Sequence, residues 1–221
     1  MVFETSPNRS NLNFSVIPKP NKKPDAMEML YNEIQRLGKE KTGIVYCLSQ
    51  DETKLIADFL LLRGIEADYY HAGQSAGDRQ LIQESWQNEQ IKVVCATIAY
   101  GMGIDKPDVR YVIHFSAPKS IEGYYQEAGR AGRDGQPSEC ILYFNRIDLG
   151  RLKRMIQMSC GGTSGARYER QMAALEKVDE YGTTQQCRRA FLVRFFGQEF
   201  TYQDCKQSCD TCKRYRSHIV L

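Results

Sequence analysis

The chain has 221 residues, enough for one α/β domain of ordinary size and a smaller appended unit. Hydrophobic residues make up 42% and charged residues 26% of it, without a membrane-length apolar run or a signal-peptide pattern, so a soluble protein in a reducing intracellular compartment is expected. The formal net charge of only +3 excludes a strong global field for nucleic acid, so any such contact must come from local basic patches.

Strand-like segments alternate with helix-like segments from about residue 11 to residue 158. The predicted strands are rich in Val, Ile, Tyr and Phe and span residues 11–17, 43–48, 67–71, 92–97, 109–115 and 140–144. The predicted helices span residues 25–37, 50–63, 75–88, 120–130 and 146–158. This alternation predicts an α/β fold, with a parallel sheet covered by helices on both faces.

The predicted helix over 50–63 begins with a recognisable cap. Ser49 followed by Glu52 three residues later fits a capping box, and Gly64 fits the end of the helix. An acidic pair after an apolar strand, here Asp51 and Glu52, is also compatible with carboxylates that hold magnesium. We favour the capping role for Glu52, because the chain contains no phosphate-binding loop of the form G-x-x-x-x-G-K-[ST].

Three polar residues follow predicted strands at the point where each strand ends. They are Ser49, His71 and Thr97, and the carboxyl ends of parallel strands meet at the edge where ligands bind in such sheets. A hydroxyl or an imidazole at this edge can bond a phosphate without reading bases. The sequence therefore predicts DNA-backbone contacts here. The alternatives are a capping threonine and a histidine whose hydrogen bonds are satisfied within the protein.

Residues 126–135 read QEAGRAGRDG and carry two arginines, Arg130 and Arg133, each preceded by a glycine. A spacing of three places both guanidinium groups on one side of a helix end. Guanidinium groups fork onto phosphate oxygens, so a fixed pair suits a triphosphate whose charge grows during cleavage. Gln126 is expected to orient phosphate or water beside them. An arginine-rich surface turn is the alternative.

The pattern changes after residue 158. Residues 159–165 (SCGGTSG) predict a turn-rich linker, and two helices without intervening strands are expected at about 167–181 and 186–196. We therefore expect a linker or chain edge over 1–10, the α/β domain over 11–158, and a small helical domain over 159–221.

The eight cysteines differ in their surroundings. Cys47, Cys95 and Cys140 lie in apolar strand-like runs and are expected to be buried core residues. Four others cluster in the basic tail and fit a tetrahedral zinc site: Cys187, Cys205, Cys209 and Cys212. The alternative is four reduced cysteines without metal.

Several of these stretches resemble the motifs of one protein family. Residues 126–135 resemble motif VI of superfamily 2 helicases in the form used by the RecQ family. Residues 95–107 (CATIAYGMGIDKP) look like that family's motif V, residues 70–73 like the short motif before it, and residues 42–54 like motif IV. The resemblance runs from about residue 11 to residue 213.

The resemblance implies specific roles for the residues that match. It implies a RecA-like second helicase lobe followed by a zinc-binding domain in which all four tail cysteines are ligands, although RecQ proteins more often have C-x2-C where this chain has Cys205-x3-Cys209. Arg130 and Arg133 would act on ATP, and Thr97 would contact DNA. Asp105 and Gly103 lie in a glycine-rich loop that would bind nucleotide, where Asp105 would bond a ribose hydroxyl or orient Arg133; the alternative for Asp105 is a simple turn aspartate.

The expected activity is that of the C-terminal half of an ATP-dependent 3′-5′ DNA helicase. The first lobe, with its phosphate loop and its ligands for Mg2+, is not found in this sequence, so the chain alone is expected to be inactive. The expected partners are DNA and a first lobe, without a membrane, in the nucleus or nucleoid. The alternative is a non-catalytic module that binds DNA or a partner through the zinc platform.

The tail also has an excess of basic residues that suits weak, sequence-independent phosphate contacts. Its basic residues are Arg188, Arg189, Arg194, Lys206, Lys213, Arg214 and Arg216. Its acidic residues are Glu199, Asp204 and Asp210. Part of this excess offsets the negative charge of four thiolates around one zinc ion.

Overall fold

The computed structural model describes residues 8–97 and 106–217, with side chains described as far as residue 214. Its centre is a six-stranded, entirely parallel sheet in the order β1-β6-β5-β2-β4-β3. The strands are β1 (Leu12–Pro18), β2 (Gly43–Tyr46), β3 (Ala67–Tyr70), β4 (Val93–Ala96), β5 (Tyr111–His114) and β6 (Ser138–Phe144). The predicted parallel sheet is confirmed, and each strand lies within a few residues of its predicted range.

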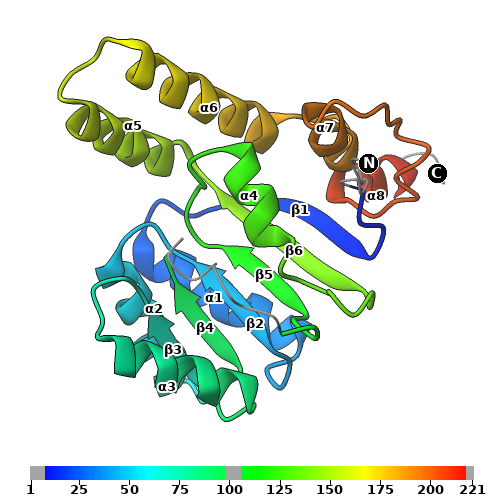
Figure 1. The fold of residues 1–221 in the computed structure, drawn as a ribbon. Helices are drawn as coiled ribbons and strands as arrows, with labels where there is room; N and C mark the ends of the chain where they lie inside the picture. The colour runs from blue at the N-terminus through cyan, green and yellow to red at the C-terminus, as the bar shows by residue number, and fades with distance from the viewer. Residues whose placement is uncertain (1–7, 98–105, 218–221) are drawn as a thin grey trace, which may run out of the picture.

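Helices cover both faces of the sheet, as predicted (Figure 1). Five of them belong to the alternating part of the chain: α1 (Lys23–Leu37), α2 (Gln50–Leu62), α3 (Ala76–Gln87), α4 (Ile121–Ala128) and α5 (Arg146–Cys160). Three follow: α6 (Ala166–Thr183), α7 (Arg188–Phe195) and α8 (Asp210–Ser217). All of these helices except α8, which is short and rich in charged residues, match helices predicted from the sequence.

Alternation along the strands divides the core into two layers. Ile44 belongs to the layer that also contains residues of α3, α4 and α5, whereas its neighbour Val45 packs in the layer formed with α1 and α2. Both side chains are fully buried, since consecutive residues of a strand point to opposite faces. Gly43 begins β2 because a Cβ there would lie 1.9 Å from the ring of Tyr111 on the adjacent strand.

Helices α5 and α6 form an antiparallel hairpin that projects beyond the sheet (Figure 1). The turn-rich segment 161–165 connects them, as predicted, and Gly161 ends α5 in the left-handed conformation. The predicted domain boundary near residue 158 falls inside the last turn of α5. Its position stays a prediction.

The C-terminal helices pack against β1, which is an edge strand of the sheet. The backbone N–H of Phe14 donates to the carbonyl of Ser208 at 3.0 Å, and the N–H of Val16 donates to the carboxylate of Asp210 at 3.3 Å. These bonds satisfy donors that an edge strand would otherwise leave to solvent or to another chain. The tail therefore completes the sheet as well as carrying the cysteines. Within the described residues, no helix is long and apolar enough to cross a membrane.

Candidate functional site

The four tail cysteines come together in space. The sulfur atoms of Cys187, Cys205, Cys209 and Cys212 all lie within 4.8 Å of one another. The Cys205–Cys209 and Cys209–Cys187 sulfur distances are 3.6 and 3.9 Å. A tetrahedron with Zn–S bonds of about 2.3 Å has ligand sulfurs about 3.8 Å apart. The four thiols therefore fit a structural zinc ion, and no other group of three or more metal-ligating side chains occurs among the described residues.

Two arginines beside the first cysteine hold the tail to the rest of the protein. Arg188 is 3% exposed and pairs with the carboxylate of Asp210 at 2.9 Å. Arg189 is 2% exposed and donates to backbone carbonyls of Arg9 and Leu12. The expectation that these two residues meet DNA phosphates is wrong, because both side chains are buried: Arg188 bonds Asp210 and Tyr181, and Arg189 bonds the start of β1.

Two residues near the N-terminus, Arg9 and Asn11, hold the loop that contains the two arginines. The guanidinium of Arg9 donates to the carbonyls of Gly129 and Gly132, and the amide of Asn11 donates to Gly132 at 2.8 Å. Gly132 has a φ of +54°, and a Cβ there would lie 2.6 Å from the side chains of Asn11 and Ser138. The loop is therefore rigidly placed, and residues 8–11 take part in the fold rather than forming a free linker.

Arg130 and Arg133 lie in the turn after α4, because the helix ends at Ala128 rather than at the predicted residue 130. Arg133 is exposed, whereas Arg130 is partly buried and hydrogen-bonds the hydroxyl of Tyr46. Burial raises the pKa of Tyr46 far above its usual range, and the charges of both arginines oppose this rise. Both guanidinium groups therefore lie close enough to Tyr46, at the carboxyl end of β2, to affect its pKa, although the two arginines belong to the loop that precedes β6.

A buried histidine lies under the same tyrosine. The ring of His114 stacks on Tyr46 with 5.2 Å between centroids, and its Nε2 lies 2.7 Å from the carboxylate of Glu127. His114 is 1% exposed, and its Nδ1 has no hydrogen-bond partner among the described residues. Gln126 is exposed on α4, next to Glu127. Asp105 and Gly103, the other predicted nucleotide-binding residues, lie outside the described residues.

The three predicted DNA contacts lie at the carboxyl edge of the sheet. Thr97 follows β4 and lines a hollow with Ser116 and Lys119, which follow β5. His71 follows β3, and its Nδ1 accepts a hydrogen bond from the N–H of Gly73 at 3.2 Å. That bond places the ring proton on Nε2, which leaves a donor for a phosphate oxygen. The oxygen of Ser49 caps α2 by accepting from the N–H of Glu52 at 3.2 Å, and its own proton remains a donor.

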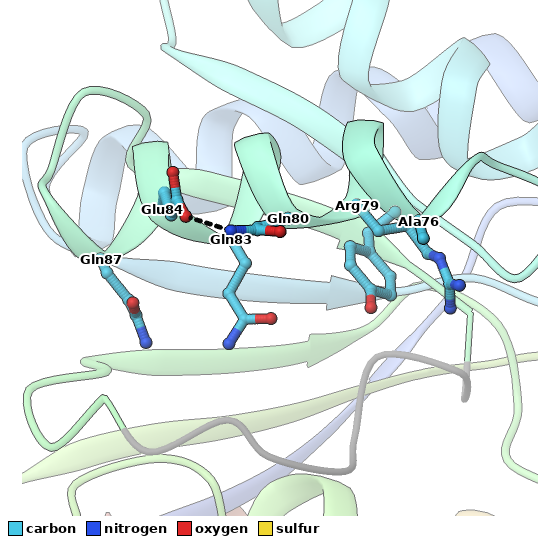
Figure 2. A pocket seen from close by; sticks show the side chains of 7 residues that line it. Ala76, Arg79, Gln80, Gln83, Glu84 and Gln87 are labelled. Carbon is cyan, nitrogen blue, oxygen red and sulfur yellow. Dashed lines mark hydrogen bonds between the residues drawn. The ribbon is translucent and has the colours of Figure 1, made fainter.

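The same edge carries a basic residue that the sequence analysis missed. Arg79, in α3, borders a hollow lined by Tyr70 and by polar side chains of the helix; Figure 2 shows Gln83 and Gln87 projecting from one side of it. The Nε atom of Arg79 is buried and has no hydrogen-bond partner among the described residues. The available signal was an arginine one turn after the Ser75 cap, with no acidic residue placed to pair with it.

Glu52 does more than close the cap. Its carboxylate accepts from the N–H of Leu48 at 2.9 Å and from the hydroxyl of Ser116 at 2.7 Å, and it lies 3.3 Å from the guanidinium of Arg151 on α5. In a capping box the carboxylate of Glu52 would accept from the backbone N–H of Ser49. Here it accepts instead from the N–H of Leu48, one residue earlier. Arg151 also pairs with Asp148, so this ionic network joins the strand-end loops to the α5–α6 hairpin. The alternative of a magnesium-holding carboxylate does not suit a side chain so fully bonded.

Replacing Glu52 with Gln should destabilise the protein by about 1–3 kcal/mol, because Ser116, Leu48 and Arg151 lose a charged acceptor. Burial alone would raise the pKa of Glu52, but the hydrogen bonds from Ser116 and Leu48 outweigh it and hold the pKa below its usual value. The contribution of the Glu52 carboxylate to the free energy of unfolding is therefore complete above pH ~4.3. It is lost as the pH falls through the lowered pKa of Glu52 in the folded protein. Urea unfolding from pH 3 to pH 7 should show a smaller acid-side loss of stability in Glu52→Gln than in wild type.

Comparisons with known proteins agree with this geometry. Residues 25–135 match the family model of the helicase conserved C-terminal domain, and residues 146–213 match that of the RecQ zinc-binding domain. The chain is 44% identical to the RecQ-like DNA helicase blm-1 of Caenorhabditis elegans, over 98% of the chain and 22% of that protein. It is 43% identical to the RecQ-like DNA helicase BLM of Xenopus laevis, over 99% of the chain and 17% of that protein.

The fold has solved counterparts as well. A DEAD-box protein from the hyperthermophile Methanococcus jannaschii superposes with a TM-score of 0.56 and 26% identity, over 70% of this chain and 41% of that one. The chain spans about a fifth of the length of the two curated relatives. Its first matched domain covers half of the sequence, and its second contains the four-cysteine cluster. The chain therefore belongs to the RecQ-like helicases, of which it comprises a conserved C-terminal helicase domain followed by a zinc-binding domain.

Proposed function

We propose that this chain is the C-terminal half of an ATP-dependent DNA helicase that moves 3′ to 5′ along one strand. In this proposal a first lobe holds the phosphates of ATP and its Mg2+, and this chain closes over the nucleotide with Arg133 and Arg130. The observation that carries the proposal is the arginine loop, which Arg9 and Asn11 fix in place and which presents an exposed Arg133. A module that only binds DNA would need no such loop.

The two arginines would have different tasks. Arg133 is exposed and can fork onto the oxygens of a transferring phosphoryl group, which is the role of an arginine finger. Arg130 is tied to the hydroxyl of Tyr46, so it would stabilise nucleotide charge from a more fixed position. Gln126, exposed on the preceding helix, would orient water or phosphate, and Asp105 and Gly103 would complete the nucleotide site.

The carboxyl edge of the sheet would hold the DNA backbone. Thr97, His71 and Ser49 each present a donor there, and Arg79 adds a cation beside them. Backbone contacts of this kind carry no sequence information, so binding should be independent of sequence. The four-cysteine cluster would hold one zinc ion with a structural role, because it fixes the tail against β1.

Thr97→Ala should weaken single-stranded DNA binding similarly for every sequence, because a phosphate contact is removed without any change in base readout. The reduction should be a few-fold, as one neutral hydrogen bond contributes about 0.5–1.5 kcal/mol. Fluorescence anisotropy on two unrelated oligonucleotides measures it, with Thr183→Ala, at the exposed carboxyl end of α6, as a control. A loss confined to one oligonucleotide would contradict backbone binding.

Unwinding polarity tests the proposal as a whole. A polypeptide in which this chain follows a first helicase lobe should, with ATP and Mg2+, unwind a duplex that has a 3′ single-stranded tail. It should leave the same duplex with a 5′ tail intact. Unwinding only from the 5′ tail would refute the polarity, and binding of both substrates without any ATP-dependent unwinding would favour the non-catalytic alternative.

A further inference from the structure

The tip of the α5–α6 hairpin carries an unusual set of basic residues. Lys153 and Arg154 lie in the second half of α5, and Arg167 and Arg170 lie in the first turns of α6. The two helices are antiparallel (Figure 1), so Arg167 and Arg170 lie beside the connection while Lys153 and Arg154 lie near the middle of α5, and all four lie outside the ion-paired base of the hairpin. All four are exposed, and Glu169 is the only acidic residue between positions 153 and 170. We call these four residues the basic tip.

The basic tip differs from the base of the same hairpin in how its charges are balanced. At the base, Arg146 pairs with Asp179 at 3.7 Å, and Lys177 pairs with Glu180 at 2.8 Å. Arg151, between base and tip, pairs with Glu52 and Asp148. By contrast, no residue of the basic tip makes an ion pair or hydrogen bond with a described residue. The tip therefore presents concentrated positive charge that the protein itself leaves unbalanced.

The placement of two of these charges opposes helix stability. The amino end of a helix carries partial positive charge, so Asp and Glu are favourable there and Lys and Arg are not. Arg167 nevertheless lies in the first turn of α6, and Arg170 follows in the next. Glu169 in the first turn offsets part of this repulsion, and the N-cap residue Gly165 adds no side-chain hydrogen bond. An anion bound at the tip would relieve this repulsion as well as that between neighbouring cations.

The basic tip is continuous with the edge that the proposed function assigns to DNA. Arg151 contacts Glu52, which caps the same helix turn as Ser49. Lys153 and Arg154 follow Arg151 by two and three residues, a rise of about 3–5 Å along the helix axis. A single strand of DNA that leaves the carboxyl edge of the sheet near Ser49 can thus continue along α5 toward the basic tip, without crossing the sheet.

We propose that the basic tip is a second contact for the phosphate backbone of DNA. It would bind the DNA strand where that strand continues beyond the carboxyl edge of the sheet. This inference rests on the proposed function, since it extends the same nucleic-acid path. The ligand is the sugar–phosphate backbone of single-stranded DNA, which matches a flexible row of cations without any base-reading surface. The tail arginines Arg188 and Arg189 do not compete for this role, because both are buried.

Three double variants of this chain test the proposal. Lys153→Ala/Arg154→Ala removes two charges from α5, and Arg167→Ala/Arg170→Ala removes two from α6. The matched control, Arg146→Ala/Lys177→Ala, removes two paired charges from the base of the same hairpin, so the net charge of all three variants is identical. The probe is a fluorescein-labelled 30-nucleotide oligo-dT, titrated by anisotropy at several salt concentrations, and circular dichroism melts check that each variant is folded.

Each tip variant should bind the oligonucleotide several-fold more weakly than the control at low salt. The slope of log affinity against log salt should become shallower by about 0.7 for each lost phosphate contact, hence by about 1.4 for a pair. Tip variants that bind as the control does would overturn the inference and would point to an acidic protein segment as the occupant of the tip. If the wild-type chain binds no DNA even at low salt, the proposed DNA path itself fails. If Thr97→Ala weakens binding and the tip variants do not, the inference about the tip alone fails.

Discussion

Arg133→Ala should abolish DNA-stimulated ATP hydrolysis by a polypeptide in which this chain follows a first helicase lobe. The exposed guanidinium is proposed to meet charge that develops on the transferring phosphoryl group, and an arginine finger contributes about 10³–10⁵ in rate. ATP binding should persist, because in the proposal the first lobe holds most of the phosphate contacts. The measurement is steady-state ATPase activity with single-stranded DNA, beside equilibrium binding of a fluorescent ATP analogue.

Two further variants separate an arginine finger from a structural arginine. Arg133→Lys should also be inactive, because an ammonium group cannot fork onto two phosphate oxygens. Arg36→Ala, which removes an exposed arginine paired with Glu33 on α1, should retain activity. Normal hydrolysis by Arg133→Ala would contradict the assignment, as would loss of nucleotide binding of the same size as the loss of rate.

Cys205→Ser should remove the zinc ion and unfold the tail. The sulfur of Cys205 lies 3.6 Å from that of Cys209, inside a cluster whose members share their hydrophobic surroundings with Phe14 of β1. Structural zinc contributes on the order of 10 kcal/mol to such sites. Tail unfolding would also free the edge of β1, so the remaining sheet should survive with a lower melting temperature and a stronger tendency to associate.

Metal analysis and limited proteolysis measure this effect. Wild type should contain about one zinc per chain and have a protease-resistant tail, whereas Cys205→Ser should lack zinc and lose residues beyond α6. Cys160→Ser is the matched control, because Cys160 is a partly buried cysteine outside the cluster. A mutant tail that stays resistant, or wild-type protein without zinc, would contradict a structural zinc site.

The fold could be predicted from the sequence because its signals are local and repeated. Strands such as 43–46 and 93–96 are short β-branched runs, and the helices between them carry apolar faces and caps such as Ser49, which accepts the N–H of Glu52 as expected. Helix α8 was missed because it is short and half of its residues are charged. Its position depends on Cys212 in the cluster and on Asp210, which pairs with Arg188, rather than on a hydrophobic pattern.

The site could be predicted only in part, since spacing identifies residues but not the contacts that hold them. The four cysteines were recognised from their spacing alone. The burial of Arg189 was not, because it depends on residues at the start of β1, roughly 175 residues earlier in the chain. The role of Arg9 in fixing the arginine loop was hidden for the same reason, as its partners Gly129 and Gly132 are distant in sequence.

The central claim is that this chain supplies half of a composite ATPase site. It is tested most directly by measuring DNA-stimulated ATP hydrolysis by the 221-residue chain alone and by a polypeptide in which the same chain follows a first helicase lobe. The claim predicts no turnover above background for the chain alone and robust DNA-stimulated turnover for the joined protein. Robust turnover by the chain alone, or none by the folded, DNA-binding joined protein, would contradict it.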